Sequence, residues 1–364
     1  MRFAYGTINE QIVFTTTASA VNEWTATNAA TGGSPTFAAT GGDTNITPVI
    51  NPKGTGIVQV GGLIFPPQSR ISISTGVPVM NATVSGATTI YYTPYVGQLV
   101  PLYDGTRFHM YDTGGELSQA TTDNTKSPAA VANNSIYDMF VWNDSGTMRC
   151  TRGPAWTNDT TRSAGTALTR INGILLNNTG ITNGPAANRG TYVGSVRSNG
   201  SAQIDFIYGA SASGGTASVL YVWNMYNQVL IGTTVTDSGV TYTYTSSTIR
   251  QARASAGNQI SFLVGLETGT AKFSYSNDQA TLAAASAFVQ IGVGFNTTSG
   301  FSSPRQTIQN GAANAHRVGM TAVYTTAPTT LGAHIISANE RSDGTNANNF
   351  DQQQEGQLSG QIMM

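Results

Sequence analysis

The stretch from residue 191 to residue 207 decides the fold: it reads TYVGSV at 191–196, contains Asn199-Gly200, and continues as AQIDFI at 202–207. Polar and apolar side chains tend to alternate in both runs, which is the period of a strand with one buried face. Thr, Tyr, Val and Ile also suit a pleated, half-buried surface. Because an Asn-Gly pair favours a tight turn between antiparallel strands, this stretch predicts two strands joined by a turn.

The same pattern extends along the chain in both directions. Alternating runs recur at 70–74, at 240–245 (VTYTYT) and at 272–275. Turn-forming pairs separate such runs at intervals of about 8–12 residues, as is typical of sandwiches and barrels. The sequence therefore predicts an all-β protein with a β-sandwich or jelly-roll-like body.

Turns and helices can be placed from the same reading. Only the windows 127–137 and 278–288 have patterns compatible with a short helix, the second because of its Ala283-Ala284-Ala285 core. The best hairpin candidates are Asp104-Gly105, Asn172-Gly173, Asn199-Gly200 and Asp237-Ser238-Gly239.

The composition excludes several classes of protein. Charged residues make up 10% of the 364 residues, the formal net charge is −1, and Thr occurs 52 times. A long helical or coiled-coil protein would need abundant Glu, Lys, Leu and Arg, and a nucleic-acid-binding protein would need a basic surface. The low net charge also argues against intrinsic disorder. We therefore expect a folded chain with a Thr-, Asn- and Gly-rich surface and no nucleic-acid partner.

Further motifs are missing from the sequence. Cys150 has no second cysteine with which to form an intrachain disulfide or a zinc site, and His109, His316 and His334 lack metal-ligand spacing. Nucleotide-binding and nucleophile-elbow motifs are absent, so we predict no cofactor and no metal. A Ca²⁺ or Mg²⁺ ion on scattered carboxylates stays open. We read no signal peptide at the start and no apolar run that spans a membrane, so we expect synthesis in a cytoplasm without export.

A change in composition near residue 70 suggests two parts. Residues 1–70 are expected to be an N-terminal β segment for attachment or oligomerisation, and residues 71–364 a large all-β domain. The tail from Ser342 to Met364, with Gln352-Gln353-Gln354, resembles low-complexity sequence. If this tail is ordered, we expect a neighbouring subunit to hold it.

The densest cluster of acidic and aromatic residues runs from Tyr103 to Asp112 and on to Glu116. Glycosidases need two carboxylates about 5–10 Å apart, so Asp104, Asp112 and Glu116 are candidates. The alternative is purely structural: Asp104 and Asp112 begin turns, and Phe108 and Met110 face one side of a strand while Arg107, His109 and Tyr111 face the other. Asp138 and Asp144, around Trp142, form a second candidate pair.

The tryptophans suggest a contact surface for a glycan or receptor. Trp142 and Trp223 lie inside apolar runs, so we expect them to be buried. Trp156 lies in a loop-like segment between Pro154 and Asn158 and is the better surface candidate. Together with the Asn199-Gly200 loop, and in particular Asn199, it is our candidate for receptor contact.

Two regions resemble proteins of bacteriophage particles. Residues 52–60 (PKGTGIVQV) resemble a short element that recurs in tail fibres, tailspikes and related appendages. A longer region, including 91–105, 140–146, 153–156 and 159–177, is similar to a module of phage and prophage structural proteins. About half to two thirds of the chain is covered. The resemblance implies a virion component, namely a homotrimeric tail fibre, head fibre, spike or capsid decoration protein, and it implies no catalytic residues.

The functional expectation follows from these observations. We expect a non-enzymatic structural protein of the virion that mediates host-surface attachment, assembles as a homo-oligomer (a trimer) and contacts other virion proteins through its N-terminal segment. The strand at 11–17 either adds to the sheet of a partner or pairs within its own domain. The alternative function is a polysaccharide-degrading spike that uses a carboxylate pair. A host-encoded adhesin is disfavoured by the missing export signal.

Overall fold

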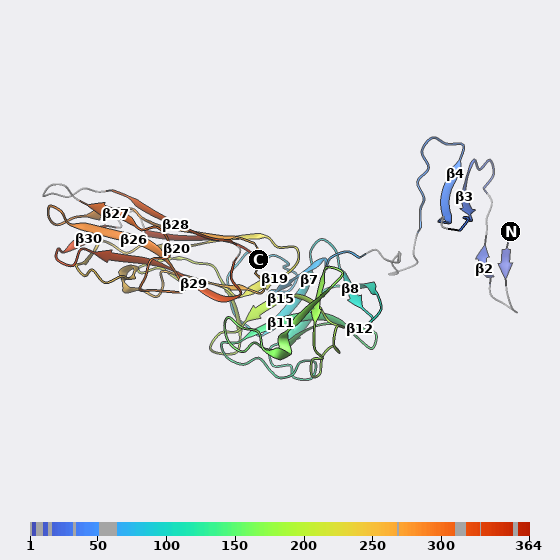
Figure 1. Cartoon of the computed structure of the whole chain (residues 1–364), viewed down its shortest axis with the longest axis horizontal. Coiled ribbons are helices and arrows are strands. Elements are labelled where there is room, and N and C mark those ends of the chain that lie inside the picture. Colours follow the sequence, from blue (N-terminus) through green and yellow to red (C-terminus); the bar gives the residue numbers. More distant parts are fainter. Residues whose placement is uncertain are drawn as a thin grey trace. The chain divides into compact units, whose positions relative to one another are not determined.

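The computed structural model consists of strands and loops, as the sequence predicts. It describes residues 2–4, 10–13, 17–31, 34–50, 64–267, 269–309, 318–327, 329–351 and 356–364. The chain divides into two compact units, Met1–Val60 and Gly61–Met364 (Figure 1). The described residues contain no α-helix and only two short 3₁₀ turns, η1 (Ala164–Thr166) and η2 (Ala252–Ala254).

The N-terminal unit holds two small antiparallel sheets. They are formed by β1 (Arg2–Ala4) with β2 (Glu10–Val13), and by β3 (Asn22–Thr27) with β4 (Thr36–Gly41). The expected strand at 11–17 thus pairs within its own chain over its first residues, through β2 with β1. The phage-like segment 52–60 lies outside the described residues.

The first part of the large unit is built from three sheets, coloured cyan to green in Figure 1. A three-stranded sheet, a hairpin and a six-stranded sheet lie here. Their strands are β5 (Ser69–Ser72), β7 (Thr89–Pro94) and β10 (Leu117–Ala120); β8 (Leu99–Tyr103) and β9 (Phe108–Asp112); and β11 (Ile136–Asp144), β12 (Thr147–Ala155), β13 (Leu168–Ile171), β14 (Ile174–Asn177), β15 (Thr191–Arg197) and β19 (Val222–Asn224).

The second part holds an eight-stranded, a five-stranded and a three-stranded sheet. The eight-stranded sheet contains β6 (Val84–Ala87), β16 (Ile204–Ile207), β18 (Ser218–Leu220), β22 (Arg250–Gln251), β23 (Gln259–Val264), β26 (Phe288–Phe295), β27 (Gln306–Gln309) and β29 (Gly332–Ser342). The five-stranded sheet contains β17 (Ser211–Ala212), β20 (Leu230–Asp237), β24 (Ala271–Asn277), β28 (Met320–Thr326) and β31 (Gly356–Met363). The remaining sheet contains β21 (Tyr242–Tyr244), β25 (Gln279–Thr281) and β30 (Asn348–Asp351).

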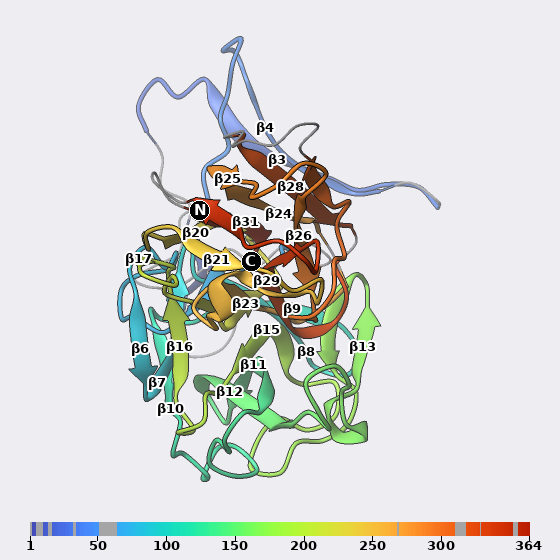
Figure 2. The ribbon, with the colours of Figure 1, turned by 90° about the vertical axis from the view of Figure 1, so that its left-hand side faces the viewer.

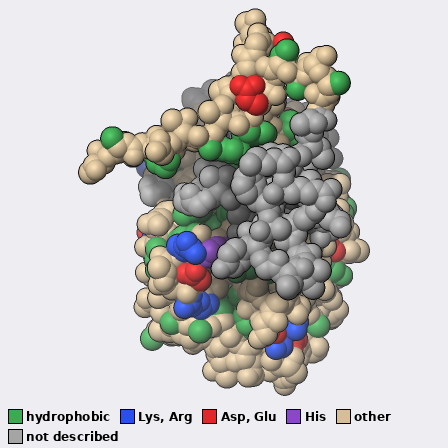
Figure 3. Space-filling view, turned by 90° about the vertical axis from the view of Figure 1, so that its right-hand side faces the viewer, with side chains coloured by type: hydrophobic (Ala, Val, Ile, Leu, Met, Phe, Trp, Pro, Cys, Tyr) green, Lys and Arg blue, Asp and Glu red, His purple; other side chains and the backbone are tan. Residues whose placement is uncertain are grey.

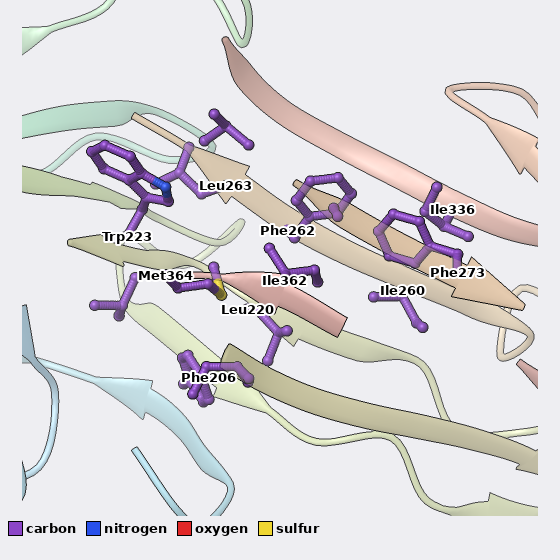
Figure 4. Close-up of a cluster of buried hydrophobic side chains, with 14 of the residues drawn as sticks. Phe206, Leu220, Trp223, Ile260, Phe262, Leu263, Phe273, Ile336, Ile362 and Met364 are labelled. Carbon is purple, nitrogen blue, oxygen red and sulfur yellow. The ribbon is translucent and has the colours of Figure 1, made fainter. Parts of the chain in front are cut away.

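The two larger sheets of this second part share buried side chains, and Figure 2 shows their strands from a second direction. Phe262 of β23 and Phe273 of β24 face each other with ring centroids 5.4 Å apart. Figure 4 shows Phe206 and Leu220 of the eight-stranded sheet beside Ile362 of the five-stranded sheet, with Trp223 of β19 in the same buried cluster. Two of the pairings, β17 with β20 and β18 with β23, are parallel, unlike those of an antiparallel jelly roll.

Neither window whose pattern is compatible with a short helix forms one. Residues 127–137 form bends and turns until β11 begins at Ile136, and residues 278–288 contain β25 and the start of β26. In the second window Leu282 and Ala287 are buried in the core. Long-range pairing and burial therefore outweigh the helix propensity of the alanines, which amounts to a few tenths of a kcal/mol per residue.

The turn predictions have mixed outcomes. Asp104-Gly105 connects β8 to β9, and Asn172-Gly173 joins β13 to β14 with positive φ at both residues, as a type I′ hairpin requires. Asn199-Gly200 also forms a turn, but this turn links strands of two different sheets. The expected hairpin at 237–239 is wrong because β20 pairs with β17 and β31, whereas β21 pairs with β30.

The C-terminal tail is held by its own chain, which corrects the expectation of a supporting subunit. The last strand, β31, lies between β20 and β24 in the middle of the five-stranded sheet. Leu358, Ile362 and Met364 are buried. The Gln352–Gln354 run lies outside the described residues. Within β31 the polar side chains of Gln357 and Gln361 lie on the exposed face of an alternating strand, whereas Leu358 and Ile362 face the core.

Candidate functional site

The β8–β9 hairpin carries the cluster of acidic and aromatic residues that the sequence singles out. Its register pairs Tyr103 with Phe108 and Leu102 with His109. Because directly opposed residues share a face, Phe108 and Met110 lie on one side and His109 and Tyr111 on the other. This alternation confirms the strand prediction for residues 108–111.

The carboxylate of Asp104 accepts hydrogen bonds from the turn that this residue begins. Its Oδ1 accepts hydrogen bonds from the backbone N–H groups of Thr106 and Arg107, at 2.7 and 2.9 Å, and its Oδ2 lies 2.8 Å from Nε2 of His109. The two backbone hydrogen bonds and the contact with His109 hold the pKa of Asp104 well below its ordinary value. A general acid of a glycosidase needs a raised pKa, so the environment of Asp104 suits a structural anion.

Asp112 is bound within its own turn, whereas Glu116 is bound by residues that are distant in sequence. Asp112 accepts a hydrogen bond from the backbone of Gly114 at 2.7 Å. Glu116 accepts hydrogen bonds from Thr75, Gly76 and Thr93, at 2.6 to 2.7 Å. Partial burial raises the pKa of Glu116, but these three hydrogen bonds outweigh it and the net shift is downward.

The second candidate pair, Asp138 and Asp144, is too far apart for glycosidase chemistry. Both lie on the extended strand β11, six residues apart, which places them about 20 Å from each other at the usual rise per residue. Asp144 forms ion pairs with Lys126 and Arg149. Asp138 is fully buried and forms an ion pair with Arg162. The two carboxylates therefore belong to separate structural networks.

The prediction that Trp156 lies on the surface is wrong. Its side chain is 6% exposed, and the Arg162 guanidinium lies 4.4 Å from the centre of its ring. The burial of Trp142 and Trp223 is confirmed. The sequence around Trp156 is typical of a loop, but in the folded chain the Trp156 ring packs against the guanidinium of Arg162, which forms an ion pair with the buried Asp138.

The side-chain amide of Asn199 forms hydrogen bonds within the turn in which it lies. Its Oδ1 accepts hydrogen bonds from the backbone of Ser201 and Gln203, at 2.8 and 3.1 Å, and its Nδ2 donates to Asp205 at 2.9 Å. Asn199 is half-buried. These contacts assign it a role in shaping the turn, whether or not the loop also meets a receptor.

A concavity of about 160 Å³ lies beside the β8–β9 hairpin. Three segments form it, namely the hairpin, the end of β11 and the loop that leads to β15. The residues that line it are Leu102, Tyr103, Asp104, Tyr111, Asn143 and Arg189. Neither Asn143 nor Arg189 stands out in the sequence, because each comes from a segment with no motif and joins the hairpin only in the folded chain.

The charged surface is sparse, in keeping with the composition. Figure 3 shows one face on which the charged side chains form a few small groups of both signs. Within the described ranges, no three His, Cys, Asp or Glu side chains are close enough to hold a metal ion. No helix of the described chain has the length and hydropathy to cross a membrane.

His334 and Cys150 belong to the interior. His334 is 4% exposed and contacts Thr330 and Asn296, and burial lowers its pKa. Cys150 is buried and free, and burial raises the pKa of its thiol. His316 lies outside the described residues.

Comparison with known proteins adds no relative to this picture: neither the protein-family models nor the curated proteins contain a match to this chain.

Proposed function

We propose that this chain is a structural protein of a bacteriophage virion, a fibre, spike or decoration component that attaches to the particle through its N-terminal unit and contacts the host surface with its large unit. We include in this proposal that it works as a homo-oligomer, most simply a trimer. The observation that carries it is the pair of exposed aromatic side chains, Trp24 and Phe37, on the apolar face of the β3–β4 hairpin.

One face of this hairpin is apolar and the other is polar. The register places Trp24 opposite Ala39, and Ala26 opposite Phe37. The rings of Trp24 and Phe37 stack with their centroids 4.5 Å apart and their planes 7° from parallel. Yet Trp24 is 41% exposed and Phe37 is 65% exposed. Two large aromatic side chains therefore remain in contact with water.

The opposite face of the hairpin carries polar side chains, so the apolar character is one-sided. Thr25 and Thr40 share a hydrogen bond at 2.5 Å, and Thr40 also contacts Glu23 at 3.3 Å. None of the described side chains in 17–50 is buried. A two-stranded sheet is marginally stable alone, and exposed apolar patches commonly mark interaction sites. This hairpin therefore gains its stability by packing against another surface, which suits a segment that attaches the protein to a particle.

The large unit needs no such support. Its described residues share a continuous core that includes Trp223, Phe206 and Phe273, each at most 2% exposed. A unit with its own hydrophobic core and a sparsely charged surface can project from a particle and make many weak polar contacts. The resemblance of residues 52–60 to elements of phage appendages agrees with an N-terminal unit that attaches to the particle and a large unit that projects from it.

Deletion of residues 2–45 tests the proposal. The shortened protein should stay folded and soluble but fail to join phage particles when they assemble in its presence. A finer variant, Trp24→Ser with Phe37→Ser, should also reduce incorporation, whereas Thr27→Ser on the polar face should not. Normal incorporation of the deletion variant would refute the attachment role.

Light scattering tests the oligomeric state separately. We expect the full-length protein to give a particle of about three times 38 kDa at micromolar concentration. A particle of 38 kDa would refute the oligomer while leaving the attachment role to the incorporation experiment.

A further inference from the structure

The concavity beside the β8–β9 hairpin contains an arginine with unused hydrogen-bonding capacity. Arg189 is exposed, and its Nη1 donates to the backbone oxygen of Tyr103 at 3.1 Å. No carboxylate of the described residues forms an ion pair with it, whereas Arg149, Arg162 and Arg197 each have one. A guanidinium carries five N–H donors in a planar fork that matches a carboxylate. Arg189 is therefore positioned to receive an anion from outside.

Asp104 does not fill this role, although it lines the same concavity. Its two oxygens are taken by Thr106, Arg107 and His109. A Cβ added at Gly105 would lie 2.5 Å from Nη2 of Arg189, so the glycine leaves room for the guanidinium to rest on the turn. The hairpin thus holds the guanidinium through Nη1, and no hydrogen bond to the described residues uses its Nε or Nη2 donors.

The remaining lining residues suit a sugar ring. Tyr103 and Tyr111 are half-buried, and Tyr103 is supported by Phe108 with ring centroids 5.1 Å apart. A fixed aromatic ring offers an electron-rich face to the polarised C–H groups of a pyranose. Asn143 is exposed. Its Oδ1 accepts a hydrogen bond from the backbone N–H of Gly146 at 2.6 Å, and its Nδ2 can donate to a hydroxyl group.

The size of the concavity limits what it can take. Its volume of about 160 Å³ is below the range of about 300–1,000 Å³ for pockets that enclose drug-sized ligands. It therefore suits one ring-sized group, with the rest of a longer chain lying outside. A polysaccharide presents such a group at each residue.

We propose that this concavity binds a carboxylate-bearing sugar residue of a polysaccharide. The carboxylate is held by Arg189, the ring lies against Tyr103 or Tyr111, and a hydroxyl group contacts Asn143. The inference rests on the proposed function for the source of the ligand, because it makes an acidic host-surface polysaccharide the receptor of the large unit.

The test is binding of the full chain to an array of bacterial polysaccharides that contain uronic acids, sialic acids or only neutral sugars. We expect binding to acidic members of the array and a loss of at least tenfold in affinity for Arg189→Met, which is the range for a hydrogen bond to a charged group. Asn143→Ala should weaken binding as well. Chemical reduction of the carboxyl groups on a bound polysaccharide should abolish binding.

Arg170→Met is the matched control. Arg170 is also exposed, and its Nη1 donates to the nearby backbone oxygen of Gly173 at 2.7 Å. Arg170 does not line the concavity, so its replacement removes the same charge outside the proposed site. Equal losses for Arg170→Met and Arg189→Met would show unspecific attraction and overturn the proposal. Wild-type affinity of Arg189→Met, binding to neutral sugars alone, or no binding to any polysaccharide would also overturn it.

Incorporation into particles separates this inference from the proposed function. Arg189→Met should join particles as the wild type does, because attachment is assigned to the N-terminal unit. A wild-type protein that binds acidic polysaccharide but never joins a particle would refute the virion role and leave the binding site standing.

Discussion

Replacement of Asp138 should destabilise the large unit more than that of any surface carboxylate. The Asp138 side chain is fully buried and that of Arg162 is 14% exposed. Arg162 Nε and Nη2 donate to the two oxygens of Asp138 at 2.9 and 3.2 Å, and Ser195 donates to Oδ1 at 2.7 Å. Burial disfavours the charge on Arg162, but Asp138 outweighs it, so the pKa of Arg162 is raised.

The size of the effect follows from the charge that is left behind. Asp138→Asn keeps the shape of the side chain but leaves a buried guanidinium without its counter-ion. Loss of one partner of a buried pair costs about 3–5 kcal/mol. With a denaturant slope of about 3 kcal/mol per M in urea, a loss of about 4 kcal/mol lowers the midpoint of unfolding by about 1.3 M. Urea unfolding followed by tryptophan fluorescence measures this midpoint.

Two controls make the experiment decisive. Asp144→Asn removes a partly exposed carboxylate from the same strand, and we expect a smaller change because water screens its ion pairs. The double variant Asp138→Leu with Arg162→Met removes both buried charges and should be more stable than Asp138→Asn. The reasoning is refuted if Asp138→Asn lowers the midpoint no more than Asp144→Asn does.

Three more predictions concern other parts of the large unit. Burial raises the pKa of Glu340 from 4.5 to about 7, so the stability that this group contributes is complete below pH 4.5 and is lost as the pH rises through about 7. The urea midpoint of the wild type should therefore fall between pH 5 and pH 8, and Glu340→Gln should make this fall smaller. An equal fall in the variant would contradict the prediction. Gly173→Ala should lower the free energy of unfolding by about 1 kcal/mol, measured in urea, because the φ angle of Gly173 is +87°. Gly200 also has open space around it but no positive φ, so Gly200→Ala should have no effect. Equal effects of the two variants would argue against the turn geometry. Ile362→Ala should lower the free energy of unfolding by about 2–5 kcal/mol because Ile362 is buried in β31. Gln361→Ala, on the exposed face of the same strand, should change it by no more than about 0.5 kcal/mol. If Ile362→Ala is tolerated, β31 is not a central strand.

The sequence by itself determined the features that depend on neighbours along the chain. Alternation predicts the strands around Asn199-Gly200, and the preference of Asn-Gly for positive φ predicts the hairpin at Asn172-Gly173, because a tight turn is specified by the residues within it. The burial of Trp142 and Trp223 is also readable, since each lies inside an apolar run.

Only the tertiary structure decided the features that depend on residues far apart. The tail from Ser342 to Met364 looks like low complexity until β31 inserts between β20 and β24, and Trp156 looks exposed until Arg162 packs over its ring. The concavity likewise needs Arg189 beside the hairpin whose turn begins with Asp104. Strand order and side-chain burial are fixed by which sheets pack together, and the free energy of that packing comes from contacts over long sequence separations that no local pattern encodes.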